Sequence, residues 1–97
     1  MAVHVWQPEP HSAVGGTVTT RMKEVSTGFH DYGVMVEPDF ITTYFDGIAA
    51  WKIATPPEHN KPLMLLVNLA LGSGWPIDKT PSPSFMYVDY VRAYAKK

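Results

Sequence analysis

The stretch "FITTYFDGIAAWKI", residues 40–53, decides the fold of this chain. Two runs rich in β-branched and aromatic residues lie on either side of Asp46-Gly47. Asp-Gly suits a type I′ turn, because both central residues of that turn need a positive φ. The stretch therefore predicts a β-hairpin with strands over 40–45 and 48–53.

Strands are also predicted on both sides of this hairpin. The upstream candidates are "AVHVW" (2–6), the alternating run "GTVTTRMKEV" (16–25), and "FHDYGVMVE" (29–37), which ends at Pro38-Asp39. The downstream candidates are "LMLLVNLAL" (63–71) and the aromatic-rich "FMYVDYVRAY" (85–94). The run 63–71 is nearly continuous apolar, as in a strand covered on both faces. Its short length between Pro62 and Gly72 favours a strand over a buried helix.

Two segments are predicted to be loops. "ATPPEHNKP" (54–62) is proline-rich, which excludes a helix and a central strand. "GSGWPIDKTPSPS" (72–84) is long enough to suggest a functional loop. With no helix of ordinary length in sight, the chain is predicted to be all-β, an antiparallel sandwich of six or seven strands.

Composition limits the partners. The 97 residues predict one domain, 1–97, and the net charge of −1 gives no reason to expect nucleic acid or an anionic membrane as partner. Without cysteine there is no disulfide and no thiolate metal site. No apolar run is long enough to span a membrane, and "MAVHVWQPEP" lacks the features of a signal peptide, so the compartment stays open.

Four segments taken in order resemble one protein family: "FHDYGVMVEPDFITTYFDG", "ATPPEHNKP", "LMLLVNLALGSGWP" and "FMYVDYVRAY". They are similar to the C-terminal part of the glycoside hydrolase family 16 domain, in the manner of laminarinases, lichenases and exopolysaccharide β-glycanases. The resemblance starts near Gly28, and residues 1–27 match loosely. It implies a partial, concanavalin-like jelly roll, a β-glucan or related polysaccharide as partner, and no cofactor. Full-length members are typically secreted.

The resemblance also implies what is missing. Retaining glycosidases need two carboxyl groups about 5–5.5 Å apart, and the family supplies them in a Glu-x-Asp-x-x-Glu strand. Glu37-Pro38-Asp39 has the first spacing, but Thr42 and Thr43 stand where the second Glu would be, and Pro38 makes this a turn. The catalytic residues are therefore expected to be absent, and the chain to be inactive alone.

The candidate substrate-binding residues are Asn68, Trp75, Trp6 and His4. An amide in an apolar strand is costly to bury unless it is hydrogen-bonded, and the family places the residue matching Asn68 in the cleft; a satisfied core amide is the alternative. Trp75 offers an indole for stacking on a pyranose ring, or packs the loop. Trp6 and His4 are weaker candidates for the same cleft.

Other candidates have a structural interpretation. Trp51 is expected in the core, and His30 is expected to be a hydrogen-bonded structural imidazole near a strand start. The four histidines show no zinc-ligand spacing, so no metal site is predicted. Some family members hold calcium, but its ligands cannot be assigned to this segment.

Three functions stay open. The chain is a β-glucan-binding fragment, a glycosidase that recruits other carboxylates (Asp31, Asp46, Asp89), or a self-associating structural β-protein without ligand. Half a jelly roll would leave strand edges and an apolar face uncovered, so a homo-oligomer that completes the sandwich is expected.

Overall fold

The computed structural model describes residues 2–5, 12–15, 27–72 and 74–97. The chain divides into two compact units, Met1–Leu63 and Met64–Lys97. The regular elements of the described residues are β1 (Ala2–Val5), β2 (Ser12–Gly15), β3 (Tyr32–Val36), β4 (Phe40–Phe45), β5 (Ile48–Ala54) and the short 3-10 helix η1 (Pro57–Asn60). Strands dominate, so the all-β prediction is confirmed.

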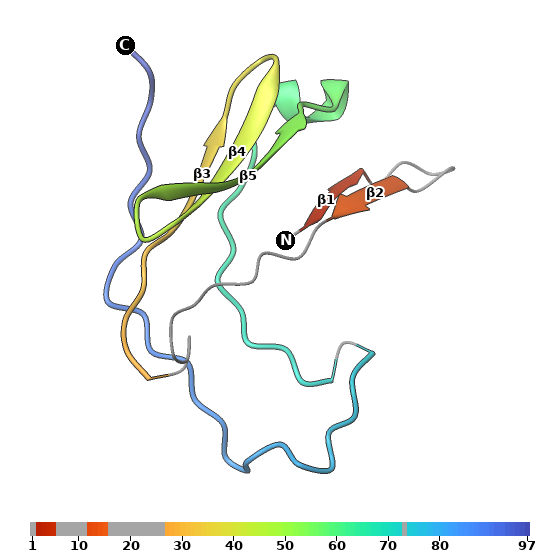
Figure 1. Ribbon diagram of the computed structural model, residues 1–97, viewed down its shortest axis with the longest axis vertical. Coiled ribbons are helices and arrows are strands. Elements are labelled where there is room, and N and C mark those ends of the chain that lie inside the picture. The colour runs from red at the N-terminus through yellow and green to blue at the C-terminus, as the bar shows by residue number, and fades with distance from the viewer. Residues whose placement is uncertain (1, 6–11, 16–26, 73) are drawn as a thin grey trace. The chain divides into compact units, whose positions relative to one another are not determined.

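The first unit holds a two-stranded and a three-stranded antiparallel sheet (Figure 1). In the smaller sheet β1 pairs with β2, from Ala2 opposite Gly15 to Val5 opposite Ser12. The predicted strand 2–6 is confirmed over Ala2–Val5, whereas β2 was not predicted. The predicted strand 16–25 lies outside the described residues.

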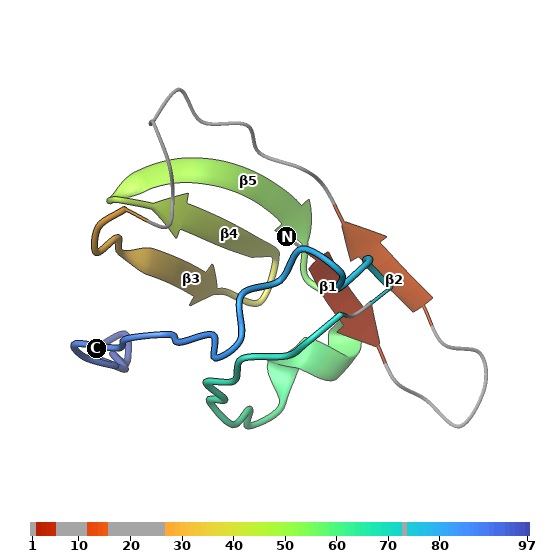
Figure 2. The same cartoon turned by 90° about the horizontal axis from the view of Figure 1, so that it is seen from below.

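The larger sheet has the order β3-β4-β5, and both views show these three arrows side by side (Figures 1 and 2). Asp46 and Gly47, between β4 and β5, have φ angles of 48° and 79°. Both angles are positive, as a type I′ turn requires, so the predicted hairpin is confirmed. A short turn at Pro38-Asp39 joins β3 to β4, closed by Glu37 N, which donates to Phe40 O at 2.9 Å.

The register assigns each side chain of this sheet to a face. Directly opposite residues share a face, and successive residues alternate. One face, here called the apolar face, carries Tyr32, Val34, Val36, Ile41, Thr43, Phe45, Ile48, Trp51 and Ile53. The other face carries Met35, Phe40, Thr42, Tyr44 and Lys52. The regular pattern is interrupted between Thr43 and Tyr44, where β5 shifts in register.

The core is small and lies on the central strand. Among the described residues, Ile41 is the buried hydrophobic residue, at 3% exposure, and its neighbour Thr42 is the buried polar one.

Thr55 lies just after β5, at the end of the sheet away from the Asp46-Gly47 turn. Its amide donates to Asp39 O at 3.0 Å and its hydroxyl donates to Glu37 O at 2.7 Å. These two hydrogen bonds thus link the end of β5 to the β3–β4 turn.

Three expectations about the rest of the chain were wrong. The segments 63–71 and 85–94 are not strands but irregular, exposed chain. The proline-rich loop contains η1, which has Pro57 at its start, where a missing N–H costs nothing. No helix in the described part of the chain is long and apolar enough to cross a membrane.

Candidate functional site

The loop that carries Trp75 is shaped by two glycines. Gly72 and Gly74 have φ angles of 84° and 89°, in the left-handed region that favours glycine. The Trp75 amide donates to Gly72 O at 2.9 Å and closes the turn. The indole itself is 80% exposed. Whether Trp75 stacks on a sugar or packs the loop stays a prediction.

Ile77 lies close against the first of these glycines. A Cβ added at Gly72 would lie 3.4 Å from Ile77 Cγ2, an ordinary van der Waals contact, so the positive φ rather than a lack of space favours glycine here. The Thr80 amide donates to Ile77 O at 3.0 Å and forms a second turn. The two turns together shape the described residues of this loop, 72 and 74–80.

An open hollow of about 420 Å³ lies in this second unit. Its lining residues are Leu69, Ala70, Leu71, Ile77, Thr80, Pro81, Ser82 and Ser84. The volume falls within the range of about 300–1,000 Å³ that small-molecule sites occupy. The lining combines hydrocarbon with three hydroxyl-bearing side chains and holds no charge, and the Ser84 hydroxyl donates to Pro81 O. Such a surface suits a neutral ligand with both C–H and hydroxyl groups.

The other predicted site residues are placed as follows. Asn68 precedes the first lining residue of the hollow and is exposed on irregular chain, so the premise of an amide within a buried strand was wrong. Its contact with sugar stays a prediction, as does the role of Trp75. His4 lies in β1 opposite Ala13. Trp6 lies outside the described residues.

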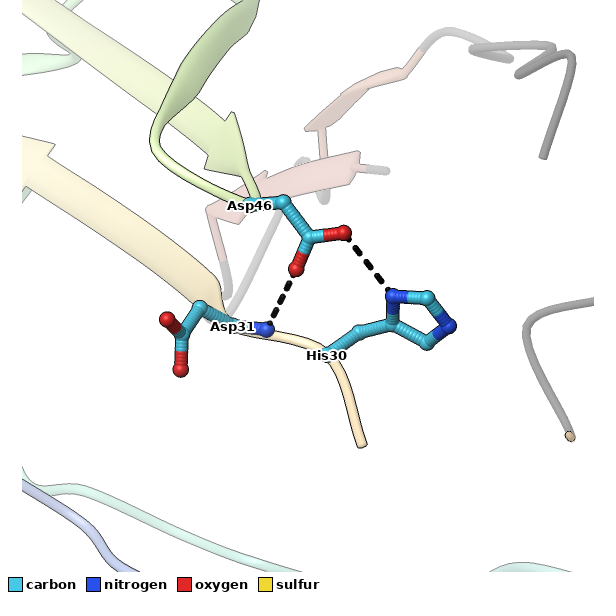
Figure 3. A network of polar contacts seen from close by, with 3 residues as sticks. All are labelled: His30, Asp31 and Asp46. Carbon is cyan, nitrogen blue, oxygen red and sulfur yellow. Dashed lines mark hydrogen bonds and ion pairs between the residues drawn. The ribbon is translucent and has the colours of Figure 1, made fainter. Parts of the chain in front are cut away.

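A polar cluster joins the start of β3 to the β4–β5 turn (Figure 3). Asp46 Oδ2 lies 2.8 Å from His30 Nδ1, and Asp46 Oδ1 accepts from the Asp31 amide at 2.8 Å. The Asp46 amide in turn donates to Asp31 O at 2.9 Å. The Asp46 carboxylate therefore links the β4–β5 turn to the residues just before β3.

These contacts lower the pKa of the Asp46 carboxyl group. The hydrogen bond from His30 lowers the pKa of Asp46 most, the hydrogen bond from the Asp31 amide lowers it further, and partial burial opposes both. The His30 ring also stacks on Phe45, with centroids 5.1 Å apart, and the rings of Phe45 and Tyr32 form a T-shaped pair with centroids 5.4 Å apart. The structural interpretation of His30 is thereby confirmed.

The cluster does not resemble a pair of catalytic carboxylates. Asp46 is engaged by two donors of the preceding segment, and the carboxylate of Asp31 points away from it in Figure 3. Asp89 is exposed in the second unit. Among the described residues, no group of three or more potential metal ligands is present.

Sequence reasoning missed two features of these sites. Asp46 was predicted as a turn residue and named as one conceivable catalytic carboxylate, but its contact with His30 was not predicted from the sequence. The hollow could not be found from sequence, because it depends on how two turns bring 69–71 and 80–84 together. Trp51, expected in the core, is half-buried on the apolar face.

The sequence of this chain is similar to parts of known proteins. The chain is 40% identical over 72 residues to the endo-1,3-1,4-beta-glycanase ExsH and 42% identical over 72 residues to the endo-1,3-1,4-beta-glycanase EglC, both of Rhizobium meliloti. It is 34% identical over 85 residues to the glucan endo-1,3-beta-glucosidase A1 of Niallia circulans. The matches cover 72%, 72% and 71% of this chain.

The chain spans only a small part of these relatives: 16% of the length of each rhizobial protein and 12% of the Niallia protein. No family model matches the sequence. No solved structure matches it either.

Proposed function

We propose that this chain is a β-glucan-directed module that binds glycan. The premise is that the chain is related to part of the β-glucanases of glycoside hydrolase family 16. The observation that carries the proposal is the identity of 40% and 42% to two proteins named as endo-1,3-1,4-beta-glycanases. Because the chain spans 16% of their length, their activity does not transfer to it whole.

The second unit supports glycan binding. Trp75 presents its indole to solvent on a loop held by Gly72 and Gly74. The uncharged hollow begins at Leu69, directly after Asn68, and offers hydroxyls beside hydrocarbon. A glucose ring has C–H faces that suit an indole or aliphatic wall, and hydroxyls at its edge that suit Ser, Thr and Asn. We assign Asn68 and Trp75 as the principal contacts, with His4 and Trp6 as further candidates.

Glycosidic cleavage is not part of the proposal. The sequence holds no Glu-x-Asp-x-x-Glu strand, and Glu37 and Asp39 belong to the β3–β4 turn. A retaining glycosidase needs its two carboxyl groups about 5–5.5 Å apart across the bond. We therefore expect binding without release of reducing ends.

The architecture that goes with this function is part of a jelly roll. We infer that β3, β4 and β5 form one layer of a two-layer sandwich, since a sheet with an apolar face needs a second layer. On this account the whole chain belongs to one domain. A structural β-protein without ligand is the alternative function, favoured by the large number of exposed apolar side chains.

Calorimetric titration with β-1,3- and mixed-linkage gluco-oligosaccharides tests the proposal. We expect saturable heat that is lost in Trp75→Ala. Tyr94→Ala is the matched control, because Tyr94 is an equally exposed aromatic residue of the same unit, at 85%, and its loss should leave binding intact. Heat that survives Trp75→Ala would remove Trp75 from the site, and no heat with any β-glucan would leave the structural alternative. Release of reducing ends would contradict the non-catalytic assignment.

A further inference from the structure

The β4–β5 turn contains the one Asp-Gly pair of the sequence, Asp46-Gly47. The other aspartates each precede a residue with a bulky side chain, namely Tyr32, Phe40, Lys79 and Tyr90. A side chain at that position shields the amide nitrogen of its own residue. Gly47 has none, it is exposed, and a Cβ built on it would meet nothing within 4 Å. Its amide nitrogen is therefore open to reaction with the carboxyl group before it.

An Asp-Gly pair can rearrange without an enzyme or an oxidant. The Gly47 nitrogen gives up its proton and bonds to Asp46 Cγ, and a carboxyl oxygen leaves as water, which closes a succinimide ring. Water then opens the ring. Attack at Cγ restores aspartate, whereas attack at the main-chain carbonyl carbon breaks the bond from that carbon to nitrogen and leaves isoaspartate. Because one water is lost and one is gained, the mass of the chain is unchanged.

The folded chain engages both oxygens of the Asp46 carboxyl group outside the turn. Oδ2 lies 2.8 Å from His30 Nδ1, and Oδ1 accepts from the Asp31 amide at 2.8 Å (Figure 3). The His30 side chain is only 14% exposed, and its ring is stacked on Phe45. Ring closure bonds Cγ to the Gly47 nitrogen and removes one of the two oxygens, so the two contacts cannot both survive it.

The backbone of the turn and the charge of the carboxyl group also oppose the reaction. The Asp46 amide donates to Asp31 O at 2.9 Å, and the pairing of β4 with β5 closes the turn, so the peptide group after Asp46 has little freedom to rotate into a ring. The contact with His30, and then that with the Asp31 amide, lowers the pKa of Asp46. The group therefore carries less often the proton that its oxygen needs in order to leave as water.

We propose that Asp46-Gly47 is a site of spontaneous isoaspartate formation, and that His30 and the Asp31 amide suppress this rearrangement while the sheet is folded. Isoaspartate adds one atom to the main chain of the turn and removes the carboxylate from its place beside His30. A two-residue turn sets the register of its hairpin, so the added atom disturbs the pairing of β4 with β5. The rearrangement would therefore damage the hairpin in chains that have spent time unfolded. The proposal does not depend on glycan binding.

Ageing of the whole 97-residue chain at neutral pH tests the site. One sample is kept folded and another is kept unfolded in urea, and peptide mapping separates isoaspartate peptides from aspartate peptides of equal mass. We expect isoaspartate at position 46 in urea and little at the other aspartates. The folded chain should react more slowly by about tenfold or more, since two hydrogen bonds to a charged group oppose ring closure. Equal rates in the two samples, or a faster rate at another aspartate, would overturn the proposal.

Two variants of the folded chain form a matched pair for the role of His30. His30→Phe keeps an aromatic ring beside Phe45 but loses the donor to Asp46. Thr55→Val loses a hydrogen bond to Glu37 O at the opposite end of the sheet. Both are aged under conditions in which circular dichroism shows that the sheet is retained.

The two variants should differ in their rates at position 46. His30→Phe should raise the rate by about fivefold to tenfold, because one of the two restraining hydrogen bonds is gone. Thr55→Val should stay close to the wild type. A rate for His30→Phe at or below that of the wild type would overturn the proposal, because His30 would then be inert or would assist the reaction as a proton donor. An equal increase in both variants would also overturn it, because general loosening of the sheet would then explain the effect.

Discussion

Strand β4 and the segment 63–71 are both rich in apolar residues, yet only β4 is paired in a sheet. Phe40–Phe45 pairs with β3 on one side and β5 on the other, and it contains the buried Ile41. Residues 63–71 are irregular and exposed. The difference lies in their neighbours. β4 is joined to both of its partners by short turns, whereas 63–71 has a proline-rich loop before it and a long loop after it. A strand with no local partner depends on distant pairing, which costs more chain entropy.

The largest effect in this comparison should come from truncating one apolar residue in each region. Ile41→Ala should lower the free energy of unfolding by about 2–4 kcal/mol, because it opens a cavity in the only buried apolar position of the described residues. Leu66→Ala should change it by less than about 0.5 kcal/mol, because Leu66 is 79% exposed. Urea unfolding followed by circular dichroism measures both. Equal losses would mean that 63–71 is packed as tightly as β4.

The turn that gives β4 its partner should show the next largest effect. Gly47→Ala should destabilise the sheet by about 1–2 kcal/mol, because an L-residue is strained at a φ of 79°. Gly28→Ala is the matched control: a Cβ would meet nothing within 4 Å at either position, and Gly28 lies outside the left-handed region. Its substitution should be neutral or slightly stabilising. A neutral Gly47→Ala would show that the hairpin turn is not what fixes β4 against β5.

At the other end of the sheet, Thr55 should contribute less. Thr55→Val removes the hydroxyl that donates to Glu37 O at 2.7 Å, at a cost of about 0.5–1.5 kcal/mol. Thr55→Ser keeps the donor and should recover most of the loss. Chemical denaturation of the two variants at one protein concentration makes the comparison. If serine gave no recovery, packing of the side chain rather than its hydrogen bond would account for the loss.

The smallest effect should be a dependence on pH. The pKa of Asp46 is lowered in the folded state, so its ionised form stabilises the fold above the ordinary value of 3.8. This contribution is lost as the pH falls through the lower, folded-state pKa. The free energy of unfolding, measured at a series of acidic pH values, should therefore depend less steeply on pH for Asp46→Asn than for the wild type. An Asp46→Asn variant with the same dependence on pH as the wild type would contradict this assignment.

Local patterns predicted the sheet well. The run 40–45 is the strand Phe40–Phe45, and the second strand of the hairpin extends one residue beyond the predicted end, to Ala54. The third predicted strand, 29–37, is shorter and begins at Tyr32. Its first residues fail to join because His30 and Asp31 are engaged with Asp46 instead. Alternation and turn chemistry capture pairs that are close in sequence, and side-chain contacts then move their ends.

The second unit was harder to predict, for a physical reason. Apolar content predicted strands at 63–71 and 85–94, but a strand needs a partner for its backbone groups, and composition does not say whether one is present. The exposure of Trp75 agrees with its place on a glycine loop. The hollow depends instead on the turns at 72–75 and 77–80, whose combined geometry no local pattern encodes.

Residue-resolved amide hydrogen exchange tests the contrast between the two regions most directly. The account predicts slow exchange for the amides paired in β3, β4 and β5, and fast exchange throughout 63–71. Such a result would mean that the sheet β3-β4-β5 is ordered, whereas the apolar segment 63–71 is open to a partner or ligand. Protection of 63–71 equal to that of β4 would contradict the account, because this segment would then have found a pairing strand.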